Sequence, residues 1–204
     1  GSYEGLVAVS ASDGTIEWQA LSNSVIAFSP CYANNTVFVS SSDGLAGVDP
    51  KDGTKKWMTN TPPTSPPTST SEAIFSGHER FVAAYSSSDG SELWRFNTNE
   101  SVVTTPAVTD NIVFVGSNAG FVYALDRMDG SELWRYRVTQ GNSGVPVRSS
   151  PTVSGNAVYL GSDSDGVYSL NKNSGEQRWL AVARPHQRLS SPAVTANIVV
   201  IGSS

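Results

Sequence analysis

Short runs of apolar residues, many of them alternating with polar ones, follow one another along the whole chain. Segments such as "AVYLGS" at 157–162 and "GFVYALD" at 120–126 are rich in β-branched and aromatic residues, and turn residues such as Asp-Gly separate them. No segment keeps the period of an amphipathic helix for more than one turn. This pattern predicts an all-β protein.

Glycine and tryptophan recur together as Gly-x-x-x-Trp, a pattern that uses every tryptophan of the chain. The pairs are Gly14/Trp18, Gly53/Trp57, Gly90/Trp94, Gly130/Trp134 and Gly175/Trp179. A Ser/Thr-Pro pair begins each unit, and from its proline to the tryptophan the four uninterrupted copies measure 27, 28, 28 and 28 residues. So regular a period indicates an array of identical supersecondary units.

Each unit reads as four short antiparallel strands, with a glycine-containing hairpin between the third and the fourth. Repeated four-stranded sheets of about 40 residues are typical of the blades of a β-propeller. We therefore predict a single domain over residues 1–204, folded as an all-β, five-bladed β-propeller of four-stranded antiparallel blades. The blades are expected at about 19–57, 58–94, 95–134 and 135–179, with a fifth formed by 180–204 joined with 1–18.

The two ends of the chain predict how the ring closes. The segment "SSPAVTANIVVIGSS" at the end contains the first two strands of a unit, and "YEGLVAVSASDGTIEW" near the beginning contains the third and fourth. We expect these halves to form one blade, with strands near Val200 and Val7 side by side, because a closed ring leaves no open sheet edge. The alternative is a piece of a ring with seven or eight blades.

The run "ALDRMDGSELW" at 124–134, followed by "SSPTVSGNAVYLGS" at 149–162, resembles the tryptophan-docking repeat of quinoprotein-like propellers. This family includes the pyrroloquinoline-quinone alcohol dehydrogenases and non-enzymatic relatives in bacterial outer-membrane protein assembly. The resemblance implies that each tryptophan packs between neighbouring blades against a glycine-containing turn. The aspartate of the repeat is replaced at Ser10, Ser86 and Asn171, which is tolerable if it is a hairpin-bonding group.

The resemblance to quinoproteins raises the question of whether this chain is an enzyme. It implies that the enzymes hold a quinone on the axis of an eight-bladed ring, with a metal ion, a carboxylate base, a stacking tryptophan and a disulfide between adjacent cysteines. This chain has a single cysteine, Cys31, and all five tryptophans stand at docking positions. We therefore expect no enzyme and no cofactor, with a degenerate quinoprotein dehydrogenase fragment as the remote alternative.

Composition narrows the partners further. The formal net charge is −5, which disfavours nucleic acid because like charges repel the phosphate backbone. His78 and His186 have no carboxylate or cysteine at ligand spacing and are interpreted as loop or strand-edge histidines. The run "GSDSDG" at 161–166 resembles the start of a calcium loop but lacks the glutamate at the twelfth position, so we assign no metal site and interpret it as a turn.

The connections between units vary in length and carry the candidate binding residues, as expected for loops on a rigid scaffold. One connection, "TNTPPTSPPTST", is rich in proline, and two others hold Arg137, Arg148, Arg184, His186 and Arg188. These basic residues are either solvated loop charges or a patch for carboxylate-bearing ligands.

From these features we predict a non-catalytic binding or scaffolding module, part of a larger extracytoplasmic protein, that binds a protein, peptide or glycan on its loop face. We expect a monomer without membrane insertion. A small-ligand sensor is the alternative function.

Overall fold

The computed structural model describes residues 5–140, 143–163, 166–182 and 188–203, and strands are the regular elements of this part of the chain. Four sheets have four antiparallel strands, in the order of the sequence. The first sheet consists of β3 (Cys31–Ala33), β4 (Thr36–Ser41), β5 (Gly44–Val48) and β6 (Lys55–Met58), and the second of β7 (Thr68–Ser69), β8 (Ala73–Gly77), β9 (Phe81–Ser86) and β10 (Glu92–Asn97). The third consists of β11 (Ala107–Val108), β12 (Ile112–Gly116), β13 (Phe121–Asp126) and β14 (Glu132–Arg137). The fourth consists of β17 (Thr152–Ser154), β18 (Ala157–Ser162), β19 (Gly166–Asn171) and β20 (Gln177–Val182).

Three smaller sheets have two strands each. They are β1 (Leu6–Val9) with β2 (Ile16–Ala20), β15 (Thr139–Gln140) with β16 (Ser143–Gly144), and β21 (Ala193–Val194) with β22 (Val199–Val200). No helix that could cross a membrane occurs in the described residues.

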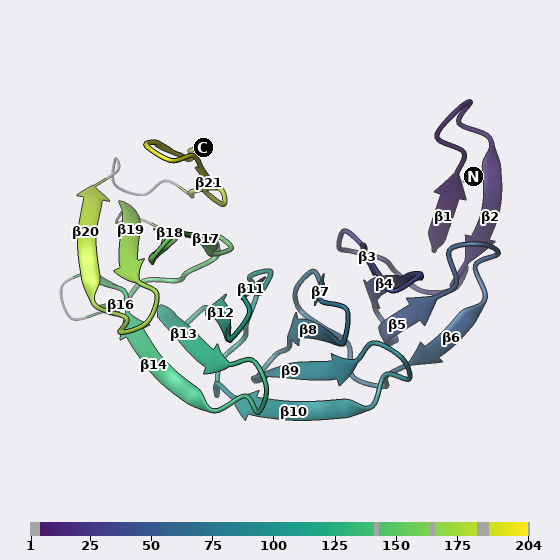
Figure 1. Cartoon of the computed structure of the whole chain (residues 1–204), viewed down its shortest axis with the longest axis horizontal. Coiled ribbons are helices and arrows are strands. Elements are labelled where there is room, and N and C mark those ends of the chain that lie inside the picture. The colour runs from purple at the N-terminus through teal and green to yellow at the C-terminus, as the bar shows by residue number, and fades with distance from the viewer. Residues whose placement is uncertain (1–4, 141–142, 164–165, 183–187, 204) are drawn as a thin grey trace.

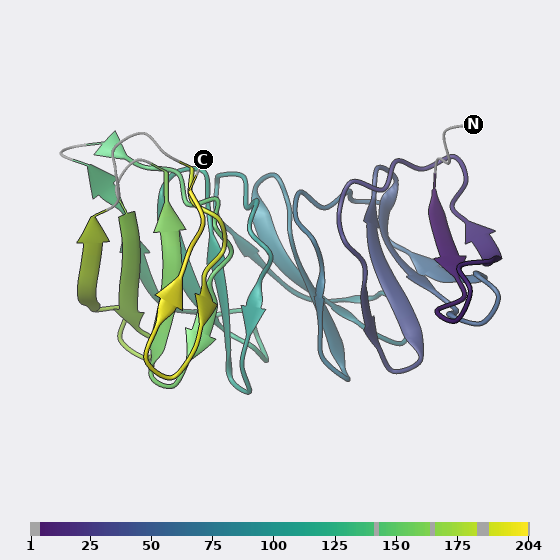
Figure 2. The ribbon, with the colours of Figure 1, turned by 90° about the horizontal axis from the view of Figure 1, so that it is seen from above.

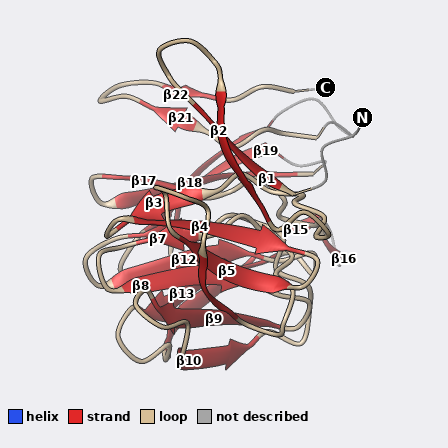
Figure 3. Ribbon diagram, turned by 90° about the vertical axis from the view of Figure 1, so that its right-hand side faces the viewer, coloured by secondary structure: helices blue, strands red, loops and turns tan. Residues whose placement is uncertain are grey.

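The sheets follow one another along an arc, with the first strand of each four-stranded sheet toward the inside of the curve and the fourth outside (Figure 1). Seen from the side, the sheets are stacked face to face (Figure 3). The all-β fold and the four-stranded antiparallel blades predicted from the repeat are confirmed.

The predicted fifth blade, and with it the closed ring, is not formed. Strand β1 pairs with β2 and strand β22 with β21, in separate sheets, and the two ends of the arc lie apart (Figure 1). The strand pattern correctly predicted which strands each end contributes. The sheets curve along an open arc that leaves a gap between these half-blades (Figure 1).

The hydrophobic core is divided into layers between successive sheets. One cluster packs Phe114 and Trp134 of the β11–β14 sheet against Leu160 and Leu170 of the β17–β20 sheet. The clusters of the other sheets are built in the same way, down to Leu6, which packs on Val48 near the beginning of the chain. Each sheet is thus held mainly by its two neighbours.

A polar residue closes each hairpin between a third and a fourth strand. In the turn after β13, a carboxylate oxygen of Asp126 accepts hydrogen bonds from the backbone N–H of Met128 (2.7 Å) and of Asp129 (3.4 Å). The hydroxyl of Ser86 and the amide oxygen of Asn171 accept equivalent bonds from residues two further on. Serine and asparagine therefore replace the aspartate of the repeat because an acceptor is all that the turn requires.

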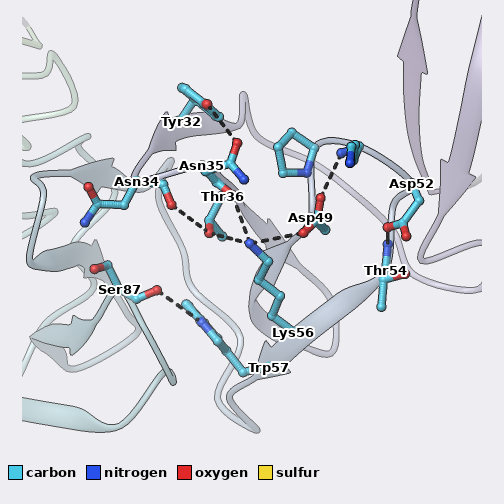
Figure 4. A network of polar contacts seen from close by, with 12 residues as sticks. Tyr32, Asn34, Asn35, Thr36, Asp49, Asp52, Thr54, Lys56, Trp57 and Ser87 are labelled. Carbon is cyan, nitrogen blue, oxygen red and sulfur yellow. Dashed lines mark hydrogen bonds and ion pairs between the residues drawn. The ribbon is translucent and has the colours of Figure 1, made fainter.

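Four tryptophan side chains connect neighbouring sheets. Each indole lies against the glycine of the next hairpin, so that an added Cβ on that glycine would come within 2.7 Å of the ring. Each indole Nε1 also donates a hydrogen bond to a backbone carbonyl three residues before that glycine. These bonds are Trp18 to Pro50 (2.9 Å), Trp57 to Ser87 (3.3 Å, Figure 4), Trp94 to Arg127 (2.9 Å) and Trp134 to Lys172 (2.9 Å).

Candidate functional site

The two rims of the arc differ in construction. The tight hairpins lie along one rim, which we call the hairpin face (Figure 2). The connections between sheets lie on the other, which we call the loop face. On the loop face, these connections are hydrogen-bonded to the turns between second and third strands. Examples are the bonds from the Asn118 N–H to the Ser101 carbonyl and from the Val147 N–H to the Ser117 carbonyl. The variable segments of the sequence are therefore gathered on one face.

A cleft of about 610 Å³ opens on the loop face beside the proline-rich connection. Residues 61–64 of this connection form one side, and residues 78–81, at the turn between β8 and β9, form the other. Pro62 is an exposed apolar wall, whereas the exposed side chains of Glu79 and Arg80 supply opposite charges. Such a combination of apolar wall and few polar groups is typical of ligand sites.

The proline-rich connection is fixed to two successive sheets, through Ser40 of β4 and Gly77 of β8, and to the next connection at Val102. The Thr64 backbone N–H donates to the carbonyl of Gly77 (2.8 Å), and the Thr64 hydroxyl donates to the carbonyl of Val102 (2.7 Å). Ser65 accepts from the N–H of Gly77 (2.9 Å) through its hydroxyl and from the Ser40 hydroxyl (3.0 Å) through its carbonyl. The cleft wall is therefore preorganised, which reduces the entropy lost when a partner binds.

His78 lies at the base of this cleft and is 1% exposed. Its Nδ1 is 3.2 Å from the carbonyl oxygen of Pro62, which can only accept, so Nδ1 carries the proton. Its Nε2 accordingly accepts from the hydroxyls of Ser76 (3.0 Å) and Tyr85 (3.2 Å). The ring also stacks on Phe81, with centroids 4.2 Å apart.

Burial lowers the pKa of His78 to about 4, while burial also raises the pKa of Tyr85 to about 12. His78 is thus neutral at pH 7. Ser76 is fully buried, and both ring nitrogens of His78 are hydrogen-bonded, to the Pro62 carbonyl and to the Ser76 and Tyr85 hydroxyls, so these residues form a buried packing network. The position of His78 beside a strand matches the sequence interpretation. Its burial did not emerge there because its partners come from the proline-rich connection, at Pro62, and from the neighbouring strand β9, at Tyr85, and only the fold brings both to the ring.

The buried, neutral state of His78 predicts a loss of stability in acid. Between the usual histidine pKa of 6.5 and its folded value of about 4, the unfolded chain binds a proton that the folded chain does not. The free energy of unfolding should therefore fall as the pH drops through this window, by about 3 kcal/mol in total.

Urea titrations of the parent protein and of His78→Gln at pH 7 and at about pH 4.5 measure this effect. The variant should lose about 2–3 kcal/mol less than the parent on acidification. An equal loss in both proteins would mean that His78 is not responsible, because every other titrating group is shared.

The basic residues predicted as a patch occupy different surroundings. Arg148 is ion-paired with Asp163, and the guanidinium of Arg137 lies 5.5 Å from the centroid of the Phe121 ring. Arg188 is exposed beside a shallow hollow that it shares with Ser190 and Gly202. Arg184 and His186 lie outside the described residues, so the structure does not place the whole predicted group.

The other sequence features fit structural roles in the described part of the chain. Of the run at 161–166, Gly161 and Ser162 end β18 and Gly166 begins β19, Asp163 is the partner of Arg148, and residues 164–165 of the predicted turn lie outside the described residues. No group of three or more potential metal-ligating side chains occurs among the residues that the structure describes. Cys31 is a half-buried free thiol whose pKa is raised by burial.

Solved structures show the same fold. The chain aligns with BamB from Moraxella catarrhalis (TM-score 0.83, 18% identity, 98% of this chain and 65% of that chain). It also aligns with the computationally designed Ika8 protein (TM-score 0.81, 16% identity, 98% of this chain and 63% of that one). A third match is the quinohemoprotein alcohol dehydrogenase ADHIIG from Pseudomonas putida HK5 (TM-score 0.79, 16% identity, 92% of this chain and 40% of that one). This chain therefore spans less than two thirds of the length of each.

The fold and the tryptophan-docking repeats define a β-propeller protein of the quinoprotein-like repeat class. The sequence matches the family described as outer membrane protein assembly factor BamB over residues 1–79 and 58–204, and the chain belongs to this family. No curated protein sequence matches the chain.

Proposed function

We propose that the chain is a non-catalytic scaffolding module that binds a protein partner on its loop face. The observation that carries this proposal is the cleft of about 610 Å³ between the proline-rich connection and the turn at 78–81. Its proline-rich wall is fixed before binding, because Thr64 and Ser65 bond to two neighbouring sheets and to the following connection at Val102. Membership of a family described as an outer membrane protein assembly factor supports a scaffolding role and an extracytoplasmic location.

The chemistry of the cleft suits an extended peptide segment. Pro62 offers a flat apolar contact, and Glu79 with Arg80 can each bind a charge of opposite sign on the partner. Phe81 is held between the His78 ring, at 4.2 Å, and the Arg95 guanidinium, 3.9 Å from its centroid, so the floor does not need to rearrange. We place the core of the partner site here.

The arginine residues predicted from the sequence extend this proposal along the same face. Arg137, Arg148 and Arg188 are exposed, and Arg184 and His186 belong to the same predicted group outside the described residues. Since Asp163 already neutralises Arg148, we assign Arg188 the larger part in contacting an acidic peptide or glycan. This patch is secondary to the cleft.

Binding of displayed dodecamer peptides, followed by calorimetry on the selected sequences, tests the proposed site. Pro62→Ala and Arg80→Ala should each weaken binding by about tenfold, equivalent to about 1.4 kcal/mol. Met128→Ala, which changes an exposed side chain on the hairpin face, is the matched control. Selected peptides whose affinity is unchanged by both cleft variants would move the site elsewhere.

A small-ligand sensor is the second candidate, because the cleft volume also falls in the range of small-molecule sites. A degenerate quinoprotein dehydrogenase is the remote one, since a solved alcohol dehydrogenase shares the fold. Titration with a metabolite library, and separately with quinone plus millimolar calcium, distinguishes them. An absorbance or melting-temperature change with quinone and calcium would contradict the non-catalytic proposal.

A further inference from the structure

The proline-rich connection borders a second hollow besides the cleft. This apolar hollow has a volume of about 130 Å³ and is lined by Pro62 and Pro63, which also line the cleft. The exposed side chains of Val25 and Ala27 and the half-buried Phe28 line it too, together with residues 40–42 at the turn between β4 and β5. The two prolines therefore stand between the apolar hollow and the cleft.

Phe28 departs from a hydrogen-bonding pattern that the other units keep. Near the start of each of them, a serine or threonine hydroxyl accepts a hydrogen bond from the N–H of a glycine twelve residues further on. These pairs are Ser65/Gly77 (2.9 Å), Thr104/Gly116 (2.8 Å), Ser149/Gly161 (3.0 Å) and Ser190/Gly202 (2.9 Å). In the first unit, Phe28 replaces the hydroxyl residue and Ser40 replaces the glycine. The repeat does not require an aromatic side chain here, and such local departures are expected at functional sites.

The apolar hollow is formed before any partner binds. The Ser42 N–H donates to the carbonyl of Val25 (3.0 Å), and the Val25 N–H donates to the Ser42 hydroxyl (3.1 Å). The Ser24 hydroxyl donates to a carboxylate oxygen of Asp43, which holds the same connection to the same turn. On the proline side, the bond from the Ser40 hydroxyl to the Ser65 carbonyl fixes the connection to β4. A partner therefore loses little entropy through ordering of this surface.

The size of the apolar hollow sets what can enter it. An apolar cavity of about 150 Å³ can hold a benzene molecule. A hollow of about 130 Å³ therefore has room for one aliphatic side chain, and Val25, Ala27 and Phe28 offer that side chain an apolar surface. A segment that crosses the two prolines in an extended conformation can place this side chain in the hollow and its next residues in the cleft.

The charges around the two sites favour a basic partner. Asp43, Glu79 and Glu100 are exposed in the turns and connections of this part of the loop face, and Arg80 opposes them. None of these four charges belongs to an ion pair within the part of the chain that the structure describes. Residues 21–50, which supply most of the hollow's lining, contain no lysine or arginine. A basic side chain is therefore attracted to this region and finds Glu79 unpaired at the cleft.

We propose that the partner is an extended peptide segment with an aliphatic residue near a lysine or arginine, an inference that rests on the proposed function of the cleft. The aliphatic side chain enters the apolar hollow and contacts Val25, Ala27 and Phe28. The segment crosses Pro62, and its basic side chain pairs with Glu79 in the cleft. The apolar hollow thus selects the partner, because a segment without the aliphatic residue leaves it empty.

Random dodecamer peptides, displayed and selected on the parent protein, test this partner chemistry. The selected sequences should share an aliphatic residue at a constant distance from a lysine or arginine. In calorimetry with the synthetic peptides, Val25→Ser should weaken binding by about tenfold, and so should Ala27→Phe, which fills the hollow. Glu79→Gln should weaken it about two- to fivefold, and less at high salt. Selected peptides without the shared aliphatic and basic residues would overturn the inference.

Val9→Ser is the matched control, because Val9 is exposed to a similar extent, 57% against 62% for Val25, but lies on β1 beside a tight hairpin. When the aliphatic residue of the peptide is replaced by alanine, Val25→Ser should have no further effect, since the contact is already lost. Binding that Pro62→Ala and Arg80→Ala weaken, but Val25→Ser and Ala27→Phe do not, would overturn this inference and leave the proposed function intact. Failure to select any peptide, or binding that none of these variants changes, would overturn both.

Discussion

Replacing Trp134 with alanine is expected to lower the free energy of unfolding by about 3–5 kcal/mol, the usual cost of truncating a buried aromatic side chain. Trp134 is 8% exposed, and its ring lies on Gly175 and contacts the Phe114 ring at a centroid distance of 5.8 Å. Its Nε1 also donates to the carbonyl of Lys172 (2.9 Å). The substitution therefore removes a whole inter-sheet junction, which urea unfolding will measure.

Trp179→Ala is the matched control because it changes the same residue at the same repeat position. Trp179 is 40% exposed and docks on no following hairpin in the described residues. We expect this variant to lose less than about 1.5 kcal/mol at low protein concentration. Similar losses in the two variants, or a loss below about 1 kcal/mol for Trp134→Ala, would show that docking between sheets is not what stabilises the tryptophans.

The second large effect is expected for Gly90→Ala. An added methyl group would stand 2.5 Å from Cε3 of the Trp57 ring, and the backbone at Gly90 has a φ of +73°. A positive φ costs an L-residue about 1–2 kcal/mol, and forcing an atom into a packed interface costs about 1–3 kcal/mol more. Thermal or urea unfolding should therefore show a loss of about 2–5 kcal/mol.

Gly155→Ala separates the two causes of this loss. Gly155 has a φ of +57° but no atom within 4 Å of the added methyl group, so only the backbone cost of about 1–2 kcal/mol should remain. The difference between the variants measures the collision with the Trp57 ring. Equal losses would indicate that the glycine is required only for its conformation.

The sequence predicted the blades well because their signals are local. In "SELWRYRV" the alternation of exposed and buried side chains marks β14, and the turn at 127–131 requires only Asp126, a glycine and small polar residues. The closure of the ring could not be predicted in this way. The angle between sheets arises from packing such as that of Trp94 on Gly130, and the same strands fit rings of different size.

The candidate site was harder to predict for a similar reason. The environment of His78 depends on the Pro62 carbonyl, from the proline-rich connection, and on the Tyr85 hydroxyl, from the neighbouring strand β9. Arg148 was interpreted as either a solvated loop charge or part of a basic patch, and its neighbour in space is Asp163, from the run that resembles a calcium loop. Spacing along the chain shows neither contact, because both connect segments that only the fold brings together.

The division of the core into layers between neighbouring sheets has a consequence for how the chain unfolds. Since each sheet is stabilised almost entirely by the sheets on either side, the free energy of opening is the sum of a term for each sheet and a term for each junction. A sheet in the middle, such as β7–β10, loses two junctions when it opens, and the β1–β2 sheet at the end loses one. Amide protons should therefore exchange in a graded order along the chain, with local opening beginning at the termini and advancing inward sheet by sheet.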